Sequence, residues 1–346
     1  MIQQIASRFA IDGTATEVKP LGEGFINDTY TVALDGDPRP RYILQRKNHL
    51  IFPDVPAMMD NIDRVTRHIK TKVQDPLRET LTVIPTREGA LYHRDADGNY
   101  WAMTLYIPGT RSYTRADTPE MAFQGGKGLG QFHRLVSDFH EPLAEVIKGF
   151  HNLRWRFQQW DEALRRDAAG RVKDLAEEIS WIESRRARIL AFQALTEDGT
   201  LPLRVTHNDT KISNFLFNES DGSLLCAIDL DTLMTASLLN DVGDALRSYT
   251  NTGEEDDRDL SRVSMSPEMY RAYIDGYLSE MDPFLTPAER DNLPFSGSFI
   301  TFEQVLRFLM DYIDGDTYYK IKYPDHNLVR TRAQYQLLLS MEAQLQ

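Results

Sequence analysis

The stretch that decides the fold is VTHNDTKISNFLF, residues 205–217. Between two apolar, strand-like runs it holds a group of polar side chains: His207, Asn208, Asp209, Lys211, Ser213 and Asn214. Polar groups so close to a core cost free energy unless a ligand or a reaction needs them. Their spacing therefore calls for a chemical explanation.

The spacing matches a catalytic pattern. His207 lies two residues before Asp209, and Asn214 lies five residues after it. This is the H-x-D-x₄-N arrangement of a kinase catalytic loop, in which the Asp acts as base and the Asn binds Mg²⁺. Lys211 would neutralise charge that develops on the transferred phosphoryl group. The alternative is a polar turn capped by Asn214, and the motif alone occurs by chance in many proteins.

A hairpin directly after the motif strengthens the catalytic interpretation. The apolar runs 215–217 and 224–228 are joined by Asn-Glu-Ser-Asp-Gly, which signals a turn between antiparallel strands. Such a hairpin delivers Asp229 and Asp231 beside the motif. A carboxylate at that strand end is where a nucleotide-bound Mg²⁺ is held. The motif and the hairpin together predict a phosphotransferase.

Length and composition set limits on the function. The 346 residues indicate two domains or lobes, and 41% hydrophobic with 26% charged residues is ordinary for a folded protein. The net charge of −13 disfavours nucleic acid and anionic membranes as partners. The single cysteine, Cys226, rules out an intramolecular disulfide, and no signal peptide or membrane-spanning run is visible. We expect a cytoplasmic enzyme, whose oligomeric state stays open.

The order of the elements predicts an α+β fold. Residues 1–10 have the apolar spacing of a short helix. Strand patterns then dominate up to about residue 107, including the runs 80–86, 89–95 and 99–107, with one helix after Pro56, and helical patterns dominate from Pro119 onward. We therefore expect two lobes. A small, antiparallel β-rich N-lobe spans 1–107, and a larger, mostly helical C-lobe spans 108–346, with a hinge near 105–109.

These residues carry a resemblance to a known family. HNDTKISN followed by IDLDT (228–232) resembles the aminoglycoside phosphotransferase and choline kinase superfamily, which has a protein-kinase-like fold. Further segments, among them IFPD (51–54), LPFSG (293–297) and RFLMDYIDGDTYYKIKYPDHNLVRTR (307–332), are similar to the N-acetylhexosamine 1-kinases within it. The similarity runs from residue 5 to about residue 332.

The resemblance implies an activity and roles for the motif residues. The activity is the ATP- and Mg²⁺-dependent phosphorylation of the anomeric hydroxyl of an N-acetylhexosamine, which gives the sugar 1-phosphate. Asp209 would accept the hydroxyl proton, and Asn214 and Asp229 would hold Mg²⁺. Asp231 would be a second metal contact or would bind sugar hydroxyls.

The cation that contacts the phosphates departs from the protein-kinase pattern. Where protein kinases carry a lysine on the third strand, the segment YILQ ends at Gln45, and Arg46 and Lys47 follow. Strand alternation puts Lys47, not Arg46, on the same face as Gln45. Gln45 and Lys47 are therefore the candidates.

The remaining nucleotide contacts are a turn and a hinge. Gly22 and Gly24 form a glycine-containing turn that would cover the nucleotide, although the third glycine of G-x-G-x-x-G is missing. The resemblance implies a hinge at 104–107, where backbone groups of Leu105 and Ile107 would meet the adenine edge.

The acceptor is expected to bind within residues 303–327, which are rich in aromatic and charged side chains. The resemblance makes Arg307 and Tyr318 sugar-binding residues. The alternative is ordinary helix packing, in which the tyrosines are half-buried and Arg307 pairs with Glu303 one turn away.

Other functions of the same fold stay open. The acceptor could be another free sugar, an amino alcohol or an aminoglycoside, and an acidic chain suits the cationic acceptors. A pseudokinase that only senses its ligand is a further alternative. It is disfavoured because Asp209, Asn214 and Asp229 are all present.

Overall fold

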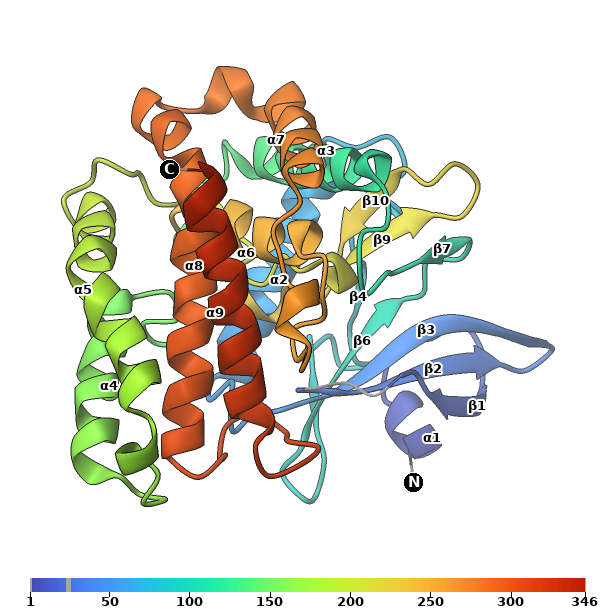
Figure 1. Cartoon of the computed structure of the whole chain (residues 1–346). Coiled ribbons are helices and arrows are strands. Elements are labelled where there is room, and N and C mark those ends of the chain that lie inside the picture. Colours follow the sequence, from blue (N-terminus) through green and yellow to red (C-terminus); the bar gives the residue numbers. More distant parts are fainter. Residues whose placement is uncertain (1, 23–25, 346) are drawn as a thin grey trace. The chain divides into compact units, whose positions relative to one another are not determined.

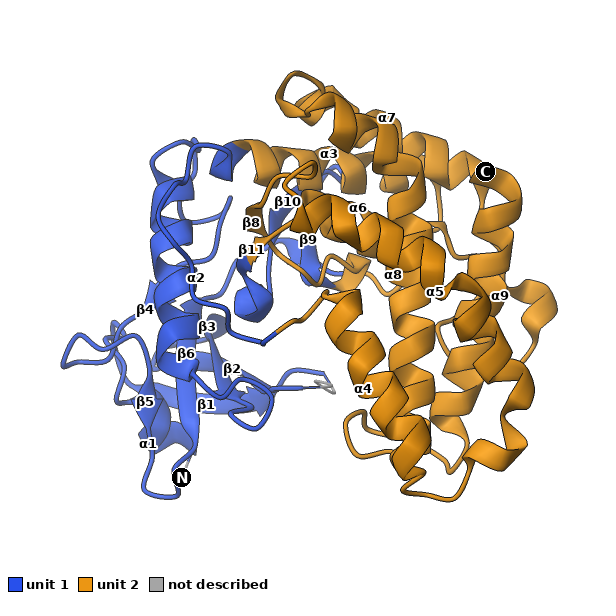
Figure 2. Ribbon diagram, turned by 90° about the vertical axis from the view of Figure 1, so that its left-hand side faces the viewer, with its two compact units in different colours: residues 1–112, 135–148, 214–234 blue, residues 113–134, 149–213, 235–346 orange. Residues whose placement is uncertain are grey.

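The computed structural model describes residues 2–22 and 26–345, with strands concentrated in the first part of the chain and helices in the rest (Figure 1). The chain separates into two compact units, coloured in Figure 2. The first comprises residues 1–112, 135–148 and 214–234, and the second comprises 113–134, 149–213 and 235–346. These units are groups of residues that contact one another and are not lobes defined by chain order. The expected lobe boundaries of 1–107 and 108–346 therefore stay a prediction.

An antiparallel sheet forms the body of the first unit. Its strand order is β1-β2-β3-β6-β4, and β5 pairs with β6. The strands are β1 (Ala15–Pro20), β2 (Asp28–Leu34), β3 (Asp37–Lys47), β4 (Val83–Ile84), β5 (His93–Arg94) and β6 (Tyr100–Leu105). The predicted antiparallel layer is confirmed, although β4 and β5 are much shorter than the apolar runs that suggested them.

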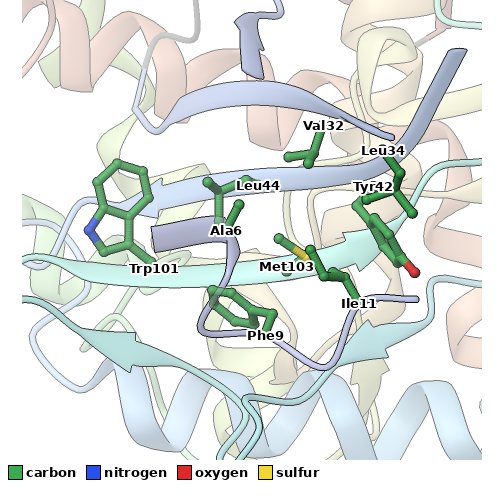
Figure 3. Packing of buried hydrophobic residues seen from close by; sticks show 9 residues of the cluster. All are labelled: Ala6, Phe9, Ile11, Val32, Leu34, Tyr42, Leu44, Trp101 and Met103. Carbon is green, nitrogen blue, oxygen red and sulfur yellow. The ribbon is translucent and has the colours of Figure 1, made fainter. Parts of the chain in front are cut away.

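One face of this sheet is covered by the N-terminal segment. Helix α1 (Ile2–Ala6) ends earlier than the ten-residue helix that its apolar spacing suggests. Figure 3 shows the buried cluster that it joins, with side chains from β2, β3 and β6 pointing to the same side: Ala6, Phe9, Ile11, Val32, Leu34, Tyr42, Leu44, Trp101 and Met103. Side chains alternate along a strand, so the residues between these face the opposite side of the sheet.

Helix α2 (Val55–Lys70) has clear signals at its start. Asp54 caps it by accepting a hydrogen bond from the backbone N–H of Ala57, and a proline occupies its first turn. Its apolar residues recur at helical spacing and are buried: Val55, Met58, Met59, Ile62, Val65 and Ile69. The helix predicted from the apolar spacing after Pro56 is therefore present.

The predicted hairpin after the motif also belongs to the first unit. Strands β9 (Phe215–Asn218) and β10 (Leu224–Ala227) pair antiparallel, and β7 (Thr110–Arg111) adds a third strand beside β9. A short 3₁₀ helix, η3 (Leu230–Thr232), follows β10.

Helices make up most of the second unit. They are α3 (Pro119–Val136, whose last two residues belong to the first unit), α4 (Leu153–Arg166), α5 (Ala176–Glu197), α6 (Leu238–Thr250), α7 (Pro267–Met281), α8 (Pro287–Ile313) and α9 (His326–Leu345). Strand β8 (Arg204–Thr206) pairs with β11 (Met234–Ala236), and single turns of 3₁₀ helix occur at η1 (Val172–Asp174), η2 (Ile212–Asn214), η4 (Leu260–Arg262) and η5 (Asp282–Phe284).

Helix α8 is the central element of this unit. Thr286 and Glu289 form a capping box at its start, and the helix packs against α4, α5, α6 and α9. Most of its side chains are buried, including the charged residues Glu303 and Arg307. Among the residues that the structure describes, no helix is both long and apolar enough to cross a membrane.

Candidate active site

The first unit contains a cavity of about 530 Å³, a volume typical of small-molecule sites. Seven predicted site residues line it: Gln45, Lys47, Leu105, Ile107, Asn214, Asp229 and Asp231. The face of β3 and β6 opposite the buried cluster supplies one wall, with Ile43, Gln45, Lys47, Ala102 and Thr104. Strand alternation thus separates the core of the sheet from its binding face.

Lys47 is a buried cation at this cavity, which Arg111 also lines. Its Nζ lies 2.6 Å from Asp231 Oδ1 and 2.7 Å from Gln45 Oε1, and the Lys47 and Asp231 side chains are each 4% exposed. Arg46 lies on the other face of β3, half-exposed and paired with Asp28. Lys47 and Gln45 therefore share one face of β3 and Arg46 lies on the other, as strand alternation predicts.

Asn27 is a further residue of this site, which the sequence reasoning missed. Its Nδ2 donates to Asp231 Oδ2 at 2.7 Å, and its Oδ1 accepts from the Asn48 N–H at 3.1 Å. Lys47 and Asn27 thus contact one carboxylate oxygen of Asp231 each. The sequence signal that could have found Asn27 is a polar residue directly before the apolar run of β2. The roles considered for Asp231, metal contact or sugar contact, stay predictions.

Asn214 and Asp229 are brought together by the hairpin. The N–H of Ile228 donates to the Asn214 carbonyl at 2.9 Å, which extends the pairing of β9 and β10 by one residue beyond Phe215 and Ala227. Asp229 follows directly, in the left-handed conformation (φ 57°, ψ 51°). A non-glycine residue held there is strained, and such strain concentrates at functional sites.

The predicted hinge and turn are located as follows. Leu105 pairs with Tyr42 at the end of β6, and Ile107 is buried, with its carbonyl accepting from the Thr110 hydroxyl at 2.7 Å. Gly22 has a positive φ of 68°, which favours glycine on conformational grounds. Gly24 lies outside the described residues.

The predicted catalytic loop belongs to the second unit up to Ser213, and its start is organised by Asp241, another residue that the sequence reasoning missed. The Asp241 carboxylate accepts from the backbone N–H groups of His207 (2.8 Å) and Asn208 (2.6 Å), and lies 2.9 Å from His133 Nε2. Burial raises the pKa of this carboxyl group, but the hydrogen bond and charge of His133 outweigh it and lower the pKa overall. An ionised Asp241 therefore fixes the start of the loop.

Within the loop, Asp209 pairs with Lys211. Their side chains lie 2.8 Å apart and are both partly exposed. The N–H of Asp209 points to His207 Nδ1 at 3.3 Å, so the imidazole of His207 braces the turn. Asn208, directly before Asp209, has a φ of 66° and is a second strained residue.

Arg307 is the most unusual side chain near this loop. It is 7% exposed, and its guanidinium carbon lies 5.2–5.7 Å from the ring centroids of Phe150, Tyr318 and Tyr319. It donates no hydrogen bond to any residue within the described part of the chain. Burial works against its charge, but Tyr319, Tyr318, Glu303 and Asp209 raise its pKa above the usual value. Arg307 and Asp209 are thus electrostatic neighbours.

The alternative pairing of Arg307 with Glu303 is wrong. Glu303 is fully buried and its Oε2 lies 2.6 Å from His151 Nδ1, while its other oxygen lies 3.8 Å from Arg156 Nε. No carboxylate lies within salt-bridge distance of Arg307 among the residues described. Sequence spacing suggested Arg307 because residues at i and i+4 lie on one face of a helix, but the fold brings His151 within hydrogen-bond distance of Glu303.

The segment that carries Tyr318 is fixed from α8. The Asp311 carboxylate accepts from the N–H groups of Thr317 (2.9 Å), Tyr318 (2.8 Å) and Tyr319 (3.0 Å), and from Asn327 Nδ2 (2.9 Å). Tyr319 is partly buried, whereas Tyr318 is 45% exposed. The two tyrosines are held at Arg307 by this carboxylate.

Comparison with solved structures shows the fold. A microcompartment-associated aminopropanol kinase has a TM-score of 0.67 at 18% identity, covering 97% of this chain and 94% of its own. An aminoglycoside phosphotransferase from Alicyclobacillus acidocaldarius has a TM-score of 0.59 at 17% identity, covering 99% and 96%. Spectinomycin phosphotransferase in complex with ADP and spectinomycin has a TM-score of 0.56 at 14% identity, covering 99% and 97%. The α+β fold is that of kinase-like phosphotransferases.

The sequence places the chain within one family. The model of the phosphotransferase enzyme family matches residues 17–288, which include the cavity residues and the predicted catalytic loop. The chain belongs to this family of phosphotransferases.

Proposed function

We propose that the protein transfers the γ-phosphoryl group of ATP, with Mg²⁺, to the anomeric hydroxyl of an N-acetylhexosamine. The nucleotide residues belong to the first unit and the acceptor residues to the second. The proposal of a sugar acceptor rests on Arg307. This buried cation is an electrostatic neighbour of Asp209, and its guanidinium group donates no hydrogen bond to the described residues.

The cavity of the first unit suits a magnesium nucleotide. Lys47 offers a cation to the phosphates, and apolar residues such as Ile43 and Leu216 suit a purine ring. Asn214 and Asp229 offer hard oxygen atoms, and Mg²⁺ uses only one or two such protein ligands besides phosphate oxygens and water. When bound, Mg²⁺ would neutralise charge on the phosphates.

The reaction needs little covalent chemistry from the protein. Asp209 accepts the proton of the anomeric hydroxyl as its oxygen bonds to the γ-phosphorus, and the bond to ADP breaks. Lys211, 2.8 Å from Asp209, supplies positive charge next to the base. The chain orients these groups, and such positioning accounts for much of the rate in phosphoryl transfer.

The charges around Arg307 favour a neutral acceptor. Arg307, Arg156 and Lys211 are cationic, and Glu303 raises the pKa of His151; among the residues described, Glu303 and Asp209 are the carboxylates that act on these groups. The carboxylate of Asp311 is turned to backbone N–H groups instead. An excess of positive charge repels an amino alcohol or an aminoglycoside but accepts hydroxyl and acetamido groups.

A panel of acceptors tests the proposal. ADP release should be measured with N-acetylglucosamine, N-acetylgalactosamine, glucosamine, ethanolamine and an aminoglycoside, with EDTA as the metal control. N-acetylglucosamine and glucosamine form a matched pair, since they differ in an acetamido group against an ammonium group. We expect kcat/KM at least about tenfold higher for the acetylated sugar, and ³¹P coupling to the anomeric proton. Turnover of the cationic acceptors alone, or a 6-phosphate product, would contradict the proposal.

Arg307→Met should weaken sugar binding specifically. The variant keeps most of the packing of the side chain but loses its charged donors. A charged hydrogen bond is worth about 1.5–3 kcal/mol, so the sugar KM should rise by about tenfold or more while the ATP KM is nearly unchanged. Steady-state kinetics with each substrate varied in turn gives both constants.

Arg330→Met is the matched control for this variant. Arg330 is as buried as Arg307 and also lies against Tyr319, but it donates to Asn327 at 3.2 Å. Its loss should lower the melting temperature and leave the sugar KM in place. If Arg307→Met behaves in the same way, Arg307 is a packing residue and the acceptor site lies elsewhere.

A further inference from the structure

His151 lies just before α4 and joins two parts of the second unit. Its side chain is 5% exposed. Nδ1 lies 2.6 Å from Glu303 Oε2 on α8, and Nε2 lies 3.1 Å from the backbone carbonyl oxygen of Asn208. The imidazole thus connects α8 to the residue that precedes Asp209.

The two contacts determine the protonation of this imidazole. A backbone carbonyl only accepts hydrogen bonds, and an ionised carboxylate does the same. A neutral imidazole has one N–H and satisfies only one of them, whereas an imidazolium satisfies both. The electrostatics agree: burial works against the charge of His151, but Glu303 outweighs it and raises the pKa, and His151 lowers the pKa of Glu303 despite its burial.

We propose that His151 is a positioning residue of the catalytic loop. Its imidazolium, kept charged by Glu303, holds the Asn208 carbonyl and thereby fixes the peptide plane that carries Asp209. The inference rests on the proposed function only in taking Asp209 as the catalytic base.

The conformation of Asn208 explains why such an anchor is needed. Its φ of 66° is costly for a residue with a side chain. Its N–H is held by Asp241 at 2.6 Å, and its side chain contacts Thr206. The His151 contact is made to the carbonyl oxygen, which belongs to the peptide plane shared with Asp209. Release of that carbonyl would leave this plane to the longer contact between the Asp209 N–H and His207 Nδ1, at 3.3 Å, and so let it tilt and change the direction of the Asp209 carboxylate.

Two substitutions at this position separate positioning from stability. The amide nitrogen of Asn lies near the place of Nδ1, and that of Gln lies near the place of Nε2. His151→Asn therefore keeps a donor to Glu303 and loses the one to Asn208, while His151→Gln does the reverse. His151→Gln leaves the buried Glu303 without its partner and should melt lower than His151→Asn.

Activity should follow the opposite order. We expect kcat of His151→Asn to fall about 10- to 100-fold, with the ATP KM within about twofold of the wild type. His151→Gln should keep a clearly higher kcat despite its lower melting temperature. If kcat follows the melting temperature, or if both variants keep the wild-type kcat, the positioning role is excluded.

Glu303→Gln gives a pH signature. The groups that face His151 are Glu303 and Arg307 on α8 and the Asn208 carbonyl in the loop, while Asp209 acts on Arg307 and Arg156 on α4 faces Glu303. In the wild type the imidazolium of His151 is fully present below the ordinary histidine pKa of 6.5. It is lost only as the pH rises through the raised pKa of His151. Without the carboxylate this loss should begin at lower pH. The alkaline fall in kcat should therefore move down by about 1–3 pH units, and an unchanged profile would count against the inference.

A measurement without substrate separates this inference from the proposed function. In protein labelled with ¹⁵N-histidine, the signals of His151, assigned by their absence in His151→Gln, should show both ring nitrogens protonated at pH 6.5, the ordinary histidine pKa, where a free imidazole is half neutral. A neutral ring would overturn the inference, whichever acceptor the enzyme uses. If N-acetylhexosamines are not turned over but His151 is an imidazolium, only the proposed acceptor fails, and the kinetic comparison then uses the acceptor that the panel identifies.

Discussion

At the scale of single residues, Asp209 combines the motif spacing with a defined setting. Lys211 lies 2.8 Å from its carboxylate, and Arg307 is an electrostatic neighbour. We expect Asp209→Asn to lower kcat by about 10²–10⁴, the usual share of a positioned general base. The fold and the affinity for MgATP should be kept, because the substitution is nearly isosteric and leaves Lys47, Asn214 and Asp229, the residues proposed to bind MgATP, in place. Steady-state kinetics, a thermal melt and calorimetry of MgATP binding test this, and near-normal turnover of the folded variant would remove Asp209 from the base role.

Lys47 offers a second test at this scale, with its neighbour as the control. Lys47→Met should weaken MgATP binding by about tenfold or more, since a charged hydrogen bond to phosphate is lost. Arg46→Met removes a cation one residue away, on the exposed face of β3, and should leave the affinity nearly unchanged. Calorimetry gives both affinities, and equal effects of the two variants would mean that only general charge matters.

The buried partner of Lys47 requires one further variant. Lys47→Met alone leaves the carboxylate of Asp231 buried without its cation, which typically costs about 3–5 kcal/mol. The double variant Lys47→Met with Asp231→Asn removes that charge, and Asn27 still has an oxygen to which it can donate. It should melt higher than the single variant, so a folded protein is available for the binding measurement.

At the scale of elements, small residues let helices of the second unit pack closely. In α3, a Cβ at Gly126 would overlap the backbone carbonyl of Tyr273 in α7. In α8, a Cβ at Gly297 would lie 3.4 Å from Leu246 Cβ, an ordinary contact. Gly126→Ala should therefore cost about 1–3 kcal/mol or more, whereas Gly297→Ala should be neutral or gain up to about 1 kcal/mol from helix propensity. Chemical denaturation of both variants measures the free energy of unfolding, and equal values would refute the close packing of α3 on α7.

Elements also show how far local patterns reach. The period-two alternation in β3 assigned Lys47 and Arg46 to opposite faces, and the turn sequence after Phe217 gave the β9–β10 hairpin. Both follow from local chemistry, because strand geometry fixes the faces and the turn residues fix the reversal. The helix expected over the first ten residues instead ended at Ala6, since its apolar side chains also fit a segment packed under the sheet.

At the scale of the whole molecule, neither unit is a continuous piece of chain. Residues 214–234 belong to the first unit, although α3, α4 and α5 separate them in the sequence from residues 1–112. Asn214 and Asp229 therefore line the same cavity as β3 and β6, although they follow the hinge by more than 100 residues. Chain order suggested lobes that change near residue 107, whereas the cavity is built from segments on both sides of that point.

The sequence by itself determined the class of fold, the phosphotransferase motif and the faces of the strands. Each of these follows from residues that are close together in the sequence, because local backbone geometry fixes how such residues are arranged. The tertiary structure alone decided which polar groups pair. Lys47 pairs with Asp231, the predicted catalytic loop is held by Asp241, and Glu303 pairs with His151 instead of Arg307. These residues lie about 30 to more than 180 positions apart, and no periodicity encodes them. They are selected because a polar group that is buried by packing must find its hydrogen bond among whatever groups the fold brings to it.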